Sequence, residues 1–355
     1  MPTITQNTEK ISLIAWTLML ASANKQLDMP GEYLWNIPDA NTFKEVRDKS
    51  RSVYSSGNSI KDKTVTDFIQ KVNFNKFMQD PHISAKFEDY FPIWIKQCPR
   101  YNLKGIDEFK YVCYAQGSQE YFLNYYFANK DKRFRIFKGE YWWHMEVWQS
   151  MNIQWAYIED DDIQTNDVVL CSFPFALTGK KHVDFDSIIA KCNKIGVEVM
   201  VDFIYLPNCT QNLVDIDLDH ECIKGLSFSF SKTFPVQNAK VAVRMTRSRL
   251  NDPMQISNDE NVANRLGCGL GLEIMQNFDV DYMVKKYQTE QTHWCKALGL
   301  HPTDVVHFAV GEPYTQYGRS ENMNWFSEYN EQYNRYNLGP LFENKALLST
   351  LELYN

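Results

Sequence analysis

The middle third of the chain alternates apolar runs with segments of helical spacing, and this alternation limits the fold more than any other feature. Val168 to Phe175 is a near-continuous apolar run, as expected of a strand buried on both faces. Phe185 to Ile195 has helical spacing and stops at Gly196, and Val197 to Phe203 is the next apolar run. Strands that alternate with helices predict an α/β fold, with a mostly parallel sheet sandwiched by crossover helices.

Other segments extend the same pattern on both sides. We expect further strands at 109–114, 134–137, 225–230 and 240–245, and further helices at 121–128 and 144–151. Thr64 to Phe91 has a helical pattern that is interrupted at Pro81. After about residue 251 the texture changes: 261–300 is helix-rich, 305–310 resembles a strand, and 311–334 is polar and loop-like. We therefore predict a large domain over 51–255 and a smaller α/β C-terminal domain over 256–355, with residues 1–50 completing the small domain and the cleft.

The overall composition excludes several classes of protein. A chain of 355 residues is long enough for two domains, and its formal net charge of −7 gives no electrostatic reason to expect nucleic acid as a partner. The eight cysteines are scattered without a CxxC pair, which argues against a zinc site and a disulfide scaffold and favours reduced thiols in the cytoplasm. The apolar stretch from Ile11 to Ala23 is too short for a membrane span and lacks a basic leader, so we expect neither a membrane protein nor a signal peptide.

The segment Ser229-Phe230-Ser231-Lys232 ends one of the apolar runs. A lysine in a cleft at the end of a buried strand is desolvated, which lowers its pKa and suits it to form a Schiff base. Asp202 and Tyr205 follow the preceding strand, and parallel sheets bind ligands at the carboxyl ends of their strands. An aspartate there can pair with a pyridinium nitrogen, and a phenol can donate to a ring oxygen. Taken singly, the lysine is better explained as a surface lysine, and the other two have alternative explanations as a capping or loop aspartate and a packing tyrosine. Together, the three residues indicate a pyridoxal 5'-phosphate (PLP) site.

Other candidate residues stand at the ends of other predicted strands. Gly117-Ser118-Gln119 opens a helix, and backbone N–H groups at a helix N-terminus bind phosphate; Ser229, Ser231 and Lys240 can add hydroxyls and a positive charge. Tyr141 can stack on a pyridine ring, and His144, one turn later, can hydrogen-bond Asp202. An aromatic core patch is the alternative explanation for Tyr141 to His144.

The order and spacing of these motifs resemble the fold-type I PLP enzymes, and among them the class I/II aminotransferases, which include aspartate aminotransferase. The resemblance extends over Ile106 to Arg247, with a looser fit beyond. The phosphate-binding turn of the family is matched by Gly117-Ser118-Gln119, and its ring-stacking aromatic residue by Tyr141. His144 matches the histidine that lies behind the aspartate in the family. Asp202 and Tyr205 match the D-x-x-Y pattern, and Ser229 to Lys232 match the S-x-S-K lysine motif.

The chain also departs from the pattern of that family. The N-P-T-G turn of the family appears as Ala176-Leu177-Thr178-Gly179, so the asparagine that donates to the 3'-oxygen is absent. Lys240 stands where the family has an arginine for the phosphate, and Arg244, four residues later on the same predicted strand, is a candidate substitute. The arginine that binds the substrate α-carboxylate is best matched by Arg335, with Arg319 as the rival.

The resemblance implies a PLP-dependent aminotransferase that moves an amino group between an amino acid and a keto acid. Lys232 would hold the cofactor as a Schiff base and then transfer the proton, with Asp202 and Tyr205 tuning the ring. It also implies a homodimer and small amino and keto acids as substrates. Two alternatives remain open: another reaction of the same fold, such as a lyase or decarboxylase, which Ala176 makes more credible, and a relative that binds a ligand without turnover.

Overall fold

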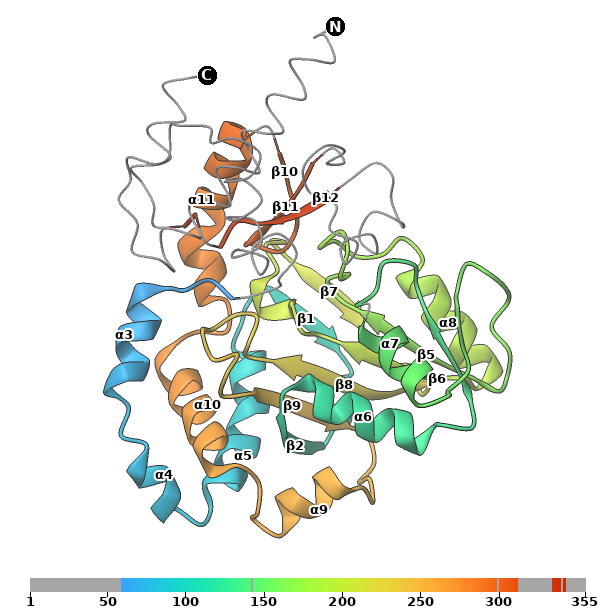
Figure 1. Cartoon of the computed structure of the whole chain (residues 1–355), viewed down its shortest axis with the longest axis horizontal. Coiled ribbons are helices and arrows are strands. Elements are labelled where there is room, and N and C mark those ends of the chain that lie inside the picture. Colours follow the sequence, from blue (N-terminus) through green and yellow to red (C-terminus); the bar gives the residue numbers. More distant parts are fainter. Residues whose placement is uncertain (1–58, 142, 299, 312–333, 340, 343–355) are drawn as a thin grey trace, which may run out of the picture.

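The computed structural model describes residues 59–141, 143–298, 300–311, 334–339 and 341–342. The segment predicted over residues 1–50, most of the predicted polar loop and Arg319 lie outside these ranges. Figure 1 shows a large sheet with helices on both sides and a smaller sheet beside helix α11.

The large sheet has seven strands in the order β2-β9-β8-β6-β5-β3-β4. Every pair in the sheet is parallel except those of β9, which runs antiparallel to both β8 and β2. The expectation of a mostly parallel sheet is thus confirmed. The strands are β2 Tyr111–Gln116, β3 Arg133–Ile136, β4 Trp155–Tyr157, β5 Asp167–Ser172, β6 Glu198–Asp202, β8 Ile223–Ser229 and β9 Val241–Thr246. A separate parallel pair joins β1 Tyr101–Lys104 to β7 Val214–Asp217.

Both faces of the large sheet are buried, which explains its continuous apolar runs. Successive residues of a strand point to opposite faces, so Val168 and Leu170 belong to one buried cluster and Val169 and Cys171 to another. One face is covered by α6 Ser118–Ala128 and α7 Trp143–Ser150. The other is covered by α5 Ile83–Lys96, α8 Phe185–Ile195 and α10 Arg265–Asn277. Helix α8 has the predicted bounds, and Gly196 caps it in the left-handed conformation at φ 74°.

The long pattern predicted over Thr64 to Phe91 divides into three helices. These are α3 Lys63–Lys71, α4 Asn75–Gln79 and α5. Helix α5 continues through Pro92, so the proline at position 81 separates two helices while Pro92 lies inside one. Helix α9 Pro253–Asp259 follows β9, and α10 follows α9.

The small sheet stands beside α11 Tyr282–Leu298 and contains β10 His301–Pro302, β11 Phe308–Gly311 and β12 Asn334–Asn337. Strand β11 pairs antiparallel with both neighbours. The buried amide of Gln291 on α11 donates to the backbone carbonyls of Thr303, Val305 and Phe308 at 3.0, 3.0 and 2.8 Å. One side chain thus holds the turn of the small sheet against the helix.

Helix α10 packs with the large sheet, although it follows the predicted domain boundary at residue 255. A Cβ atom added to Gly269 or Gly271 would meet the rings of Phe77 and Phe87 at 2.2 and 2.4 Å, which shows how closely α10 approaches α4 and α5. The division of the chain into 51–255 and 256–355 stays a prediction, and this packing favours a boundary after α10.

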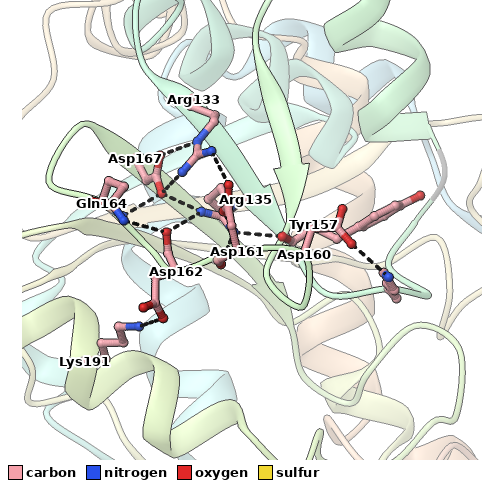
Figure 2. Close-up of polar contacts among 10 residues, drawn as sticks. Arg133, Arg135, Tyr157, Asp160, Asp161, Asp162, Gln164, Asp167 and Lys191 are labelled. Carbon is pink, nitrogen blue, oxygen red and sulfur yellow. Dashed lines mark hydrogen bonds and ion pairs between the residues drawn. The ribbon is translucent and has the colours of Figure 1, made fainter.

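A network of ion pairs joins the amino ends of β3 and β5, at the edge opposite the strand ends where the site was predicted (Figure 2). Asp167, 2% exposed, accepts from Arg133 at 2.8 Å and from the fully buried Arg135 at 2.7 Å. Arg135 also donates to the carbonyls of Tyr157 and Asp161 at 2.8 and 2.7 Å. The buried charges of Arg135 and Asp167 thus compensate each other where β3 lies beside β5.

Three further properties bear on the expectations from composition. Among the described residues, no helix combines the length and the apolar character needed to span a bilayer. Nor does this part of the chain contain a group of three or more His, Cys, Asp or Glu side chains suited to a metal ion. All eight cysteines are buried, and none forms a disulfide.

Candidate active site

A cavity of about 330 Å³ opens at the carboxyl ends of the parallel strands. Asp202 ends β6, Gly117 follows β2, and the segment to Lys232 follows β8. Because β9 is reversed, the residue that precedes it, Lys240, reaches the same edge. All the predicted site residues except His144 and Ser229 line this cavity: Gly117, Ser118, Gln119, Tyr141, Asp202, Tyr205, Ser231, Lys232, Lys240 and Arg335.

Asp202 is a buried carboxyl group in the cavity wall. It is 3% exposed, and its Oδ1 atom has no hydrogen-bond partner among the described residues. Burial raises its pKa to about 8, with a further contribution from the negative charge of Glu140, while Lys232 acts in the opposite direction. A buried carboxyl group with an unpaired oxygen is costly. The arrangement therefore suits a ligand that brings a hydrogen-bond donor or a positive charge to this atom.

Lys232 has an amine whose pKa is lowered to about 8. Burial is the main cause, the positive charges of Arg335 and Lys240 add to it, and Asp202 opposes them. An amine with such a pKa is deprotonated in about a tenth of the molecules at pH 7, far more than an ordinary lysine, and the free amine can attack a carbonyl carbon. This is the property that the sequence predicted for the lysine after the strand.

The turn between β2 and α6 has the geometry of an anion site. Gly117 has φ +81°, and α6 begins at the next residue. The N-terminus of α6, where the backbone N–H groups are not used within the helix, therefore lies at the cavity. A Cβ atom at position 117 would lie 3.4 Å from Cδ of Lys240, which places the lysine stem against the glycine. Lys240 itself has φ 56°, and the Tyr114 hydroxyl donates to its carbonyl at 3.0 Å. The dipole of α6 and the charge of Lys240 therefore both favour an anion beside Gly117.

The two serines of the S-x-S-K segment form a pair. Their hydroxyls lie 2.7 Å apart, and the N–H of Ser231 donates to Oγ of Ser229 at 3.2 Å. Ser231 lines the cavity, whereas Ser229 is 2% exposed and lies behind it. Ser229 therefore contacts Ser231, which lines the cavity, and does not line the cavity itself. The direct contact of Ser229 with a phosphate stays a prediction.

The aromatic segment is both cavity wall and core. Tyr141 lines the cavity, with its hydroxyl 3.5 Å from Nε2 of Gln119, and its ring stacks on Trp143 at a centroid distance of 6.1 Å. His144 is 1% exposed and contacts the Tyr126 hydroxyl through Nδ1, and burial lowers its pKa to about 3. No hydrogen bond joins His144 to Asp202 in the structure, so His144 lies in the aromatic core that we gave as its alternative.

Arg335 lies on β12 of the small sheet and lines the same cavity. Its guanidinium donates to the carbonyl of Ala176, stands 4.3 Å over the ring of Phe308, and shares a hydrogen bond with the side chain of Tyr205. Burial raises the pKa of the Tyr205 phenol, and Arg335 opposes that rise. A half-buried guanidinium in the same cavity as Lys232 can bind a carboxylate.

Arg244 does not reach the cavity, so the suggestion that it substitutes for the phosphate arginine is wrong. Its fully buried side chain pairs with Asp252 and donates to Gln255 at 3.1 Å, within the layer of α6 and α9. The argument from an even offset fails because Lys240 precedes β9 in a left-handed conformation and does not share the alternation of the strand.

Glu140 and Ser172 were not predicted, although both line the cavity. Glu140 is 5% exposed and accepts from the N–H and the hydroxyl of Ser172, both at 2.7 Å. The Ser172 hydroxyl in turn accepts from the N–H of Ala176 at 3.0 Å. Burial raises the pKa of Glu140 to about 7. The only signal in the sequence is the place of Glu140 in the turn before Tyr141, which marks a strand end but no chemistry.

Comparison with known proteins supports the fold and leaves the reaction open. No protein-family model matches the chain, and no curated protein matches it in sequence. Solved structures do match: an aminotransferase from Staphylococcus aureus has a TM-score of 0.59 at 14% identity, covering 92% of this chain and 99% of its own. A PLP-bound aminotransferase candidate from Clostridium difficile 630 has a TM-score of 0.62 at 11% identity, covering 90% and 99%.

A third neighbour has a different reaction in its name. The L-threonine-O-3-phosphate decarboxylase from Porphyromonas gingivalis has a TM-score of 0.50 at 14% identity, and the match covers 68% of this chain and 84% of the decarboxylase. At these identities the likeness establishes the fold. The chain therefore has the fold of PLP-dependent aminotransferases of class I/II, in agreement with the resemblance that its motifs indicated.

Proposed function

We propose that the protein is a PLP-dependent aminotransferase that moves an amino group between an amino acid and a keto acid. The observation that carries the proposal is the pairing of Lys232, whose amine is desolvated, with Asp202, whose buried Oδ1 has no partner, in one cavity. The fold of solved aminotransferases supports it independently.

The residues of the cavity fit PLP at each end. The phosphate would be held by the N–H groups that begin α6 and by the charge of Lys240, and Gly117 leaves room for that approach. Tyr141 offers a ring for stacking, and Asp202 offers a carboxylate for the pyridinium nitrogen. When bound, PLP supplies a ring that accepts electrons from the substrate Cα.

The chemistry of the protein then lies in four side chains. Lys232 anchors the cofactor, and its Nζ atom later takes a proton from the substrate Cα and returns it as general base and acid. Asp202 compensates a positive charge at its Oδ1 atom. Arg335 binds the carboxylate of the substrate and so orients the bond to be broken above the lysine. Tyr205 donates to the ring oxygen that the missing asparagine at position 176 would otherwise contact.

A decarboxylase or lyase is the second candidate, and Ala176 favours it. The backbone N–H of Ala176 donates to Ser172 and its side chain contributes no hydrogen bond, so a tuning contact of the aminotransferases is absent. A decarboxylase is also among the proteins of similar fold. A ligand-binding relative without turnover is the third candidate, which the departures at 176 and 240 support.

One experiment distinguishes these functions. The purified protein is incubated with PLP and a panel of amino acids, and pyridoxamine phosphate, keto acid and carbon dioxide are measured. Transamination predicts pyridoxamine phosphate and keto acid in equal amounts. Carbon dioxide without pyridoxamine phosphate would favour the decarboxylase, and no product across the panel would favour binding without turnover.

We also propose a homodimer in the cytoplasm. Eight buried thiols without a disulfide are typical of a reducing compartment. Sedimentation velocity tests the assembly: a species of twice the mass of the 41.7 kDa chain is expected, and a monomer at micromolar concentration would contradict it.

A further inference from the structure

Asn208 connects the peptide of Lys232 to the small sheet. It ends the short helix η3 Leu206–Asn208 after Tyr205 and is fully buried. Its side-chain Nδ2 atom donates to the backbone carbonyl of Lys232 at 2.8 Å. Its backbone carbonyl accepts from the N–H of Val306 at 2.9 Å. This asparagine therefore contacts the backbone of the proposed catalytic lysine on one side and the turn before β11 on the other.

His307 stands next to Asn208 and is also fully buried. Its Nδ1 atom lies 3.4 Å from Nδ2 of Asn208, so Nδ1 must be the acceptor and the neutral ring carries its proton on Nε2. Burial lowers the pKa of His307 to about 3, and the charges of Lys232 and Arg335 add to this effect. The ring is therefore neutral in the physiological range.

The contacts continue from His307 to the strand of Arg335. The carbonyl of His307 accepts from the N–H of Leu338 at 2.7 Å, three residues beyond Arg335. An unbroken series of hydrogen bonds thus runs from Lys232 through Asn208 and His307 to the segment that follows Arg335. It joins the group that would transfer the proton to the group that would hold the carboxylate.

Burial of this pair is not explained by stability. Oδ1 of Asn208 and Nε2 of His307 both lack partners among the described residues. Two unpaired polar atoms in a fully buried contact cost free energy that apolar side chains of similar size would avoid. A role other than packing accounts better for their presence beside Lys232.

We propose that Asn208 and His307 are positioning residues that fix Lys232 relative to Arg335, an inference that rests on the proposed function. Neither touches the cavity, and both act through the peptide of Lys232 and the small sheet. With the anchor intact, the Lys232 amine is held among Asp202, Lys240, Arg335 and His307, the charged and titratable groups around it. Without the anchor, the amine gains access to water.

The test uses variants of the full chain that differ in one contact. Asn208→Leu removes the donor to Lys232, and His307→Leu removes the acceptor, whereas His307→Asn keeps an acceptor near the place of Nδ1. The matched control is Asn258→Leu, because the buried Asn258 also donates to a backbone carbonyl, that of Tyr114 at 3.0 Å, and does not line the cavity. The pKa of Lys232 is read in the PLP-free protein from the pH dependence of its acetylation by acetic anhydride, followed by peptide mapping.

A positioning role predicts that the pKa of Lys232 rises from about 8 toward the ordinary 10.5 in Asn208→Leu and His307→Leu. The rise should be about one unit, and His307→Asn should reverse most of it. In the PLP-loaded protein, kcat should fall by about tenfold or more with little change in KM. Asn258→Leu should change neither quantity.

Unchanged Lys232 titration and kcat in both leucine variants, even with a melting temperature lowered as in Asn258→Leu, would show that the pair is only structural and would overturn the inference. If Asn208→Leu does not fold, the comparison of His307→Leu with His307→Asn decides. Failure of wild-type Lys232 to form an adduct with PLP would instead overturn the proposed function, because the acetylation measurement does not use PLP.

Discussion

At the residue scale, Asp202 and Glu140 place two buried carboxyl groups in the wall of one cavity. The pKa of Asp202 is raised to about 8 by burial and then by the charge of Glu140. Replacing Glu140 by Gln removes that charge, while the amide can keep both contacts with Ser172. We predict that the pKa of Asp202 falls by on the order of one unit in this variant.

Carboxyl carbon NMR of the PLP-free protein across pH measures this change. The control is Glu159→Gln, because this exposed carboxylate does not line the cavity and accepts from the backbone N–H of Lys138. An Asp202 titration that is the same in wild type and Glu140→Gln would show that burial alone sets its pKa.

At the scale of elements, the turn before α6 and the cap after α8 each contain a glycine with a positive φ angle. Gly117 has φ 81° and ψ 154°, a region that is open almost only to glycine, so alanine costs about 1–3 kcal/mol of stability there. Gly196 has φ 74° and ψ 25°, in the left-handed helical region, where alanine costs about 1–2 kcal/mol. Only at Gly117 would the new Cβ meet a neighbour, Lys240, whereas nothing lies within 4 Å at Gly196. We predict that Gly117→Ala weakens PLP binding by about tenfold or more and that Gly196→Ala does not. Absorbance titration gives the two Kd values, and equal values would contradict a phosphate site at α6.

The ion-pair network at the opposite edge of the sheet is an element of stability (Figure 2). Burial raises the pKa of Asp167, but hydrogen bonds from Arg133, Gln164 and Arg135 outweigh it and hold that pKa below 3.8. Asp167→Asn removes the buried acidic partner of Arg135, which keeps an ion pair with the half-exposed Asp161, and should lower the free energy of unfolding by about 3 kcal/mol. Asp160→Asn, which breaks an exposed pair with Lys138, should change it little. Urea unfolding of both variants tests this, and equal losses would show that the network contributes no more than a surface pair.

At the scale of the whole molecule, the buried acids of the cavity make stability depend on pH. The folded protein keeps protons on Asp202 and Glu140 up to pKa values of about 8 and about 7, whereas the unfolded chain releases them near 3.8 and 4.5. Because the folded state binds more protons at these two groups, their contribution to the free energy of unfolding falls as pH rises from about 4 to about 8. The double variant Asp202→Asn, Glu140→Gln lacks this contribution, so its stability should fall less, or rise more, over that range than the stability of the wild type. Thermal unfolding of the PLP-free protein across that range measures it, and parallel curves would refute the assignment.

The large sheet was predictable because burial on both faces leaves apolar runs in the sequence, as in β5 and β6. The residues of the site were predictable because they stand where these runs end, at the carboxyl ends of parallel strands. What was missed depends on tertiary contacts. The β1–β7 pair is formed by polar, partly exposed strands such as Asn102 facing Asp215, which carry no apolar signal. Glu140, Asn208 and His307 acquire their roles only when distant segments meet. The Lys240–Arg244 offset misled because strand alternation ends where the chain turns left-handed at Lys240.

The most direct test of the account is the identity of the residue that reacts with PLP. The protein is incubated with PLP, its visible absorbance is recorded, and the adduct is reduced with borohydride and mapped by peptide mass spectrometry, with Lys232→Ala alongside. We predict a visible band and a single modified peptide carrying the adduct on Lys232, both absent from the folded Lys232→Ala variant. No band in the wild type, or an adduct on another lysine, would contradict the assignment of this cavity as a PLP site.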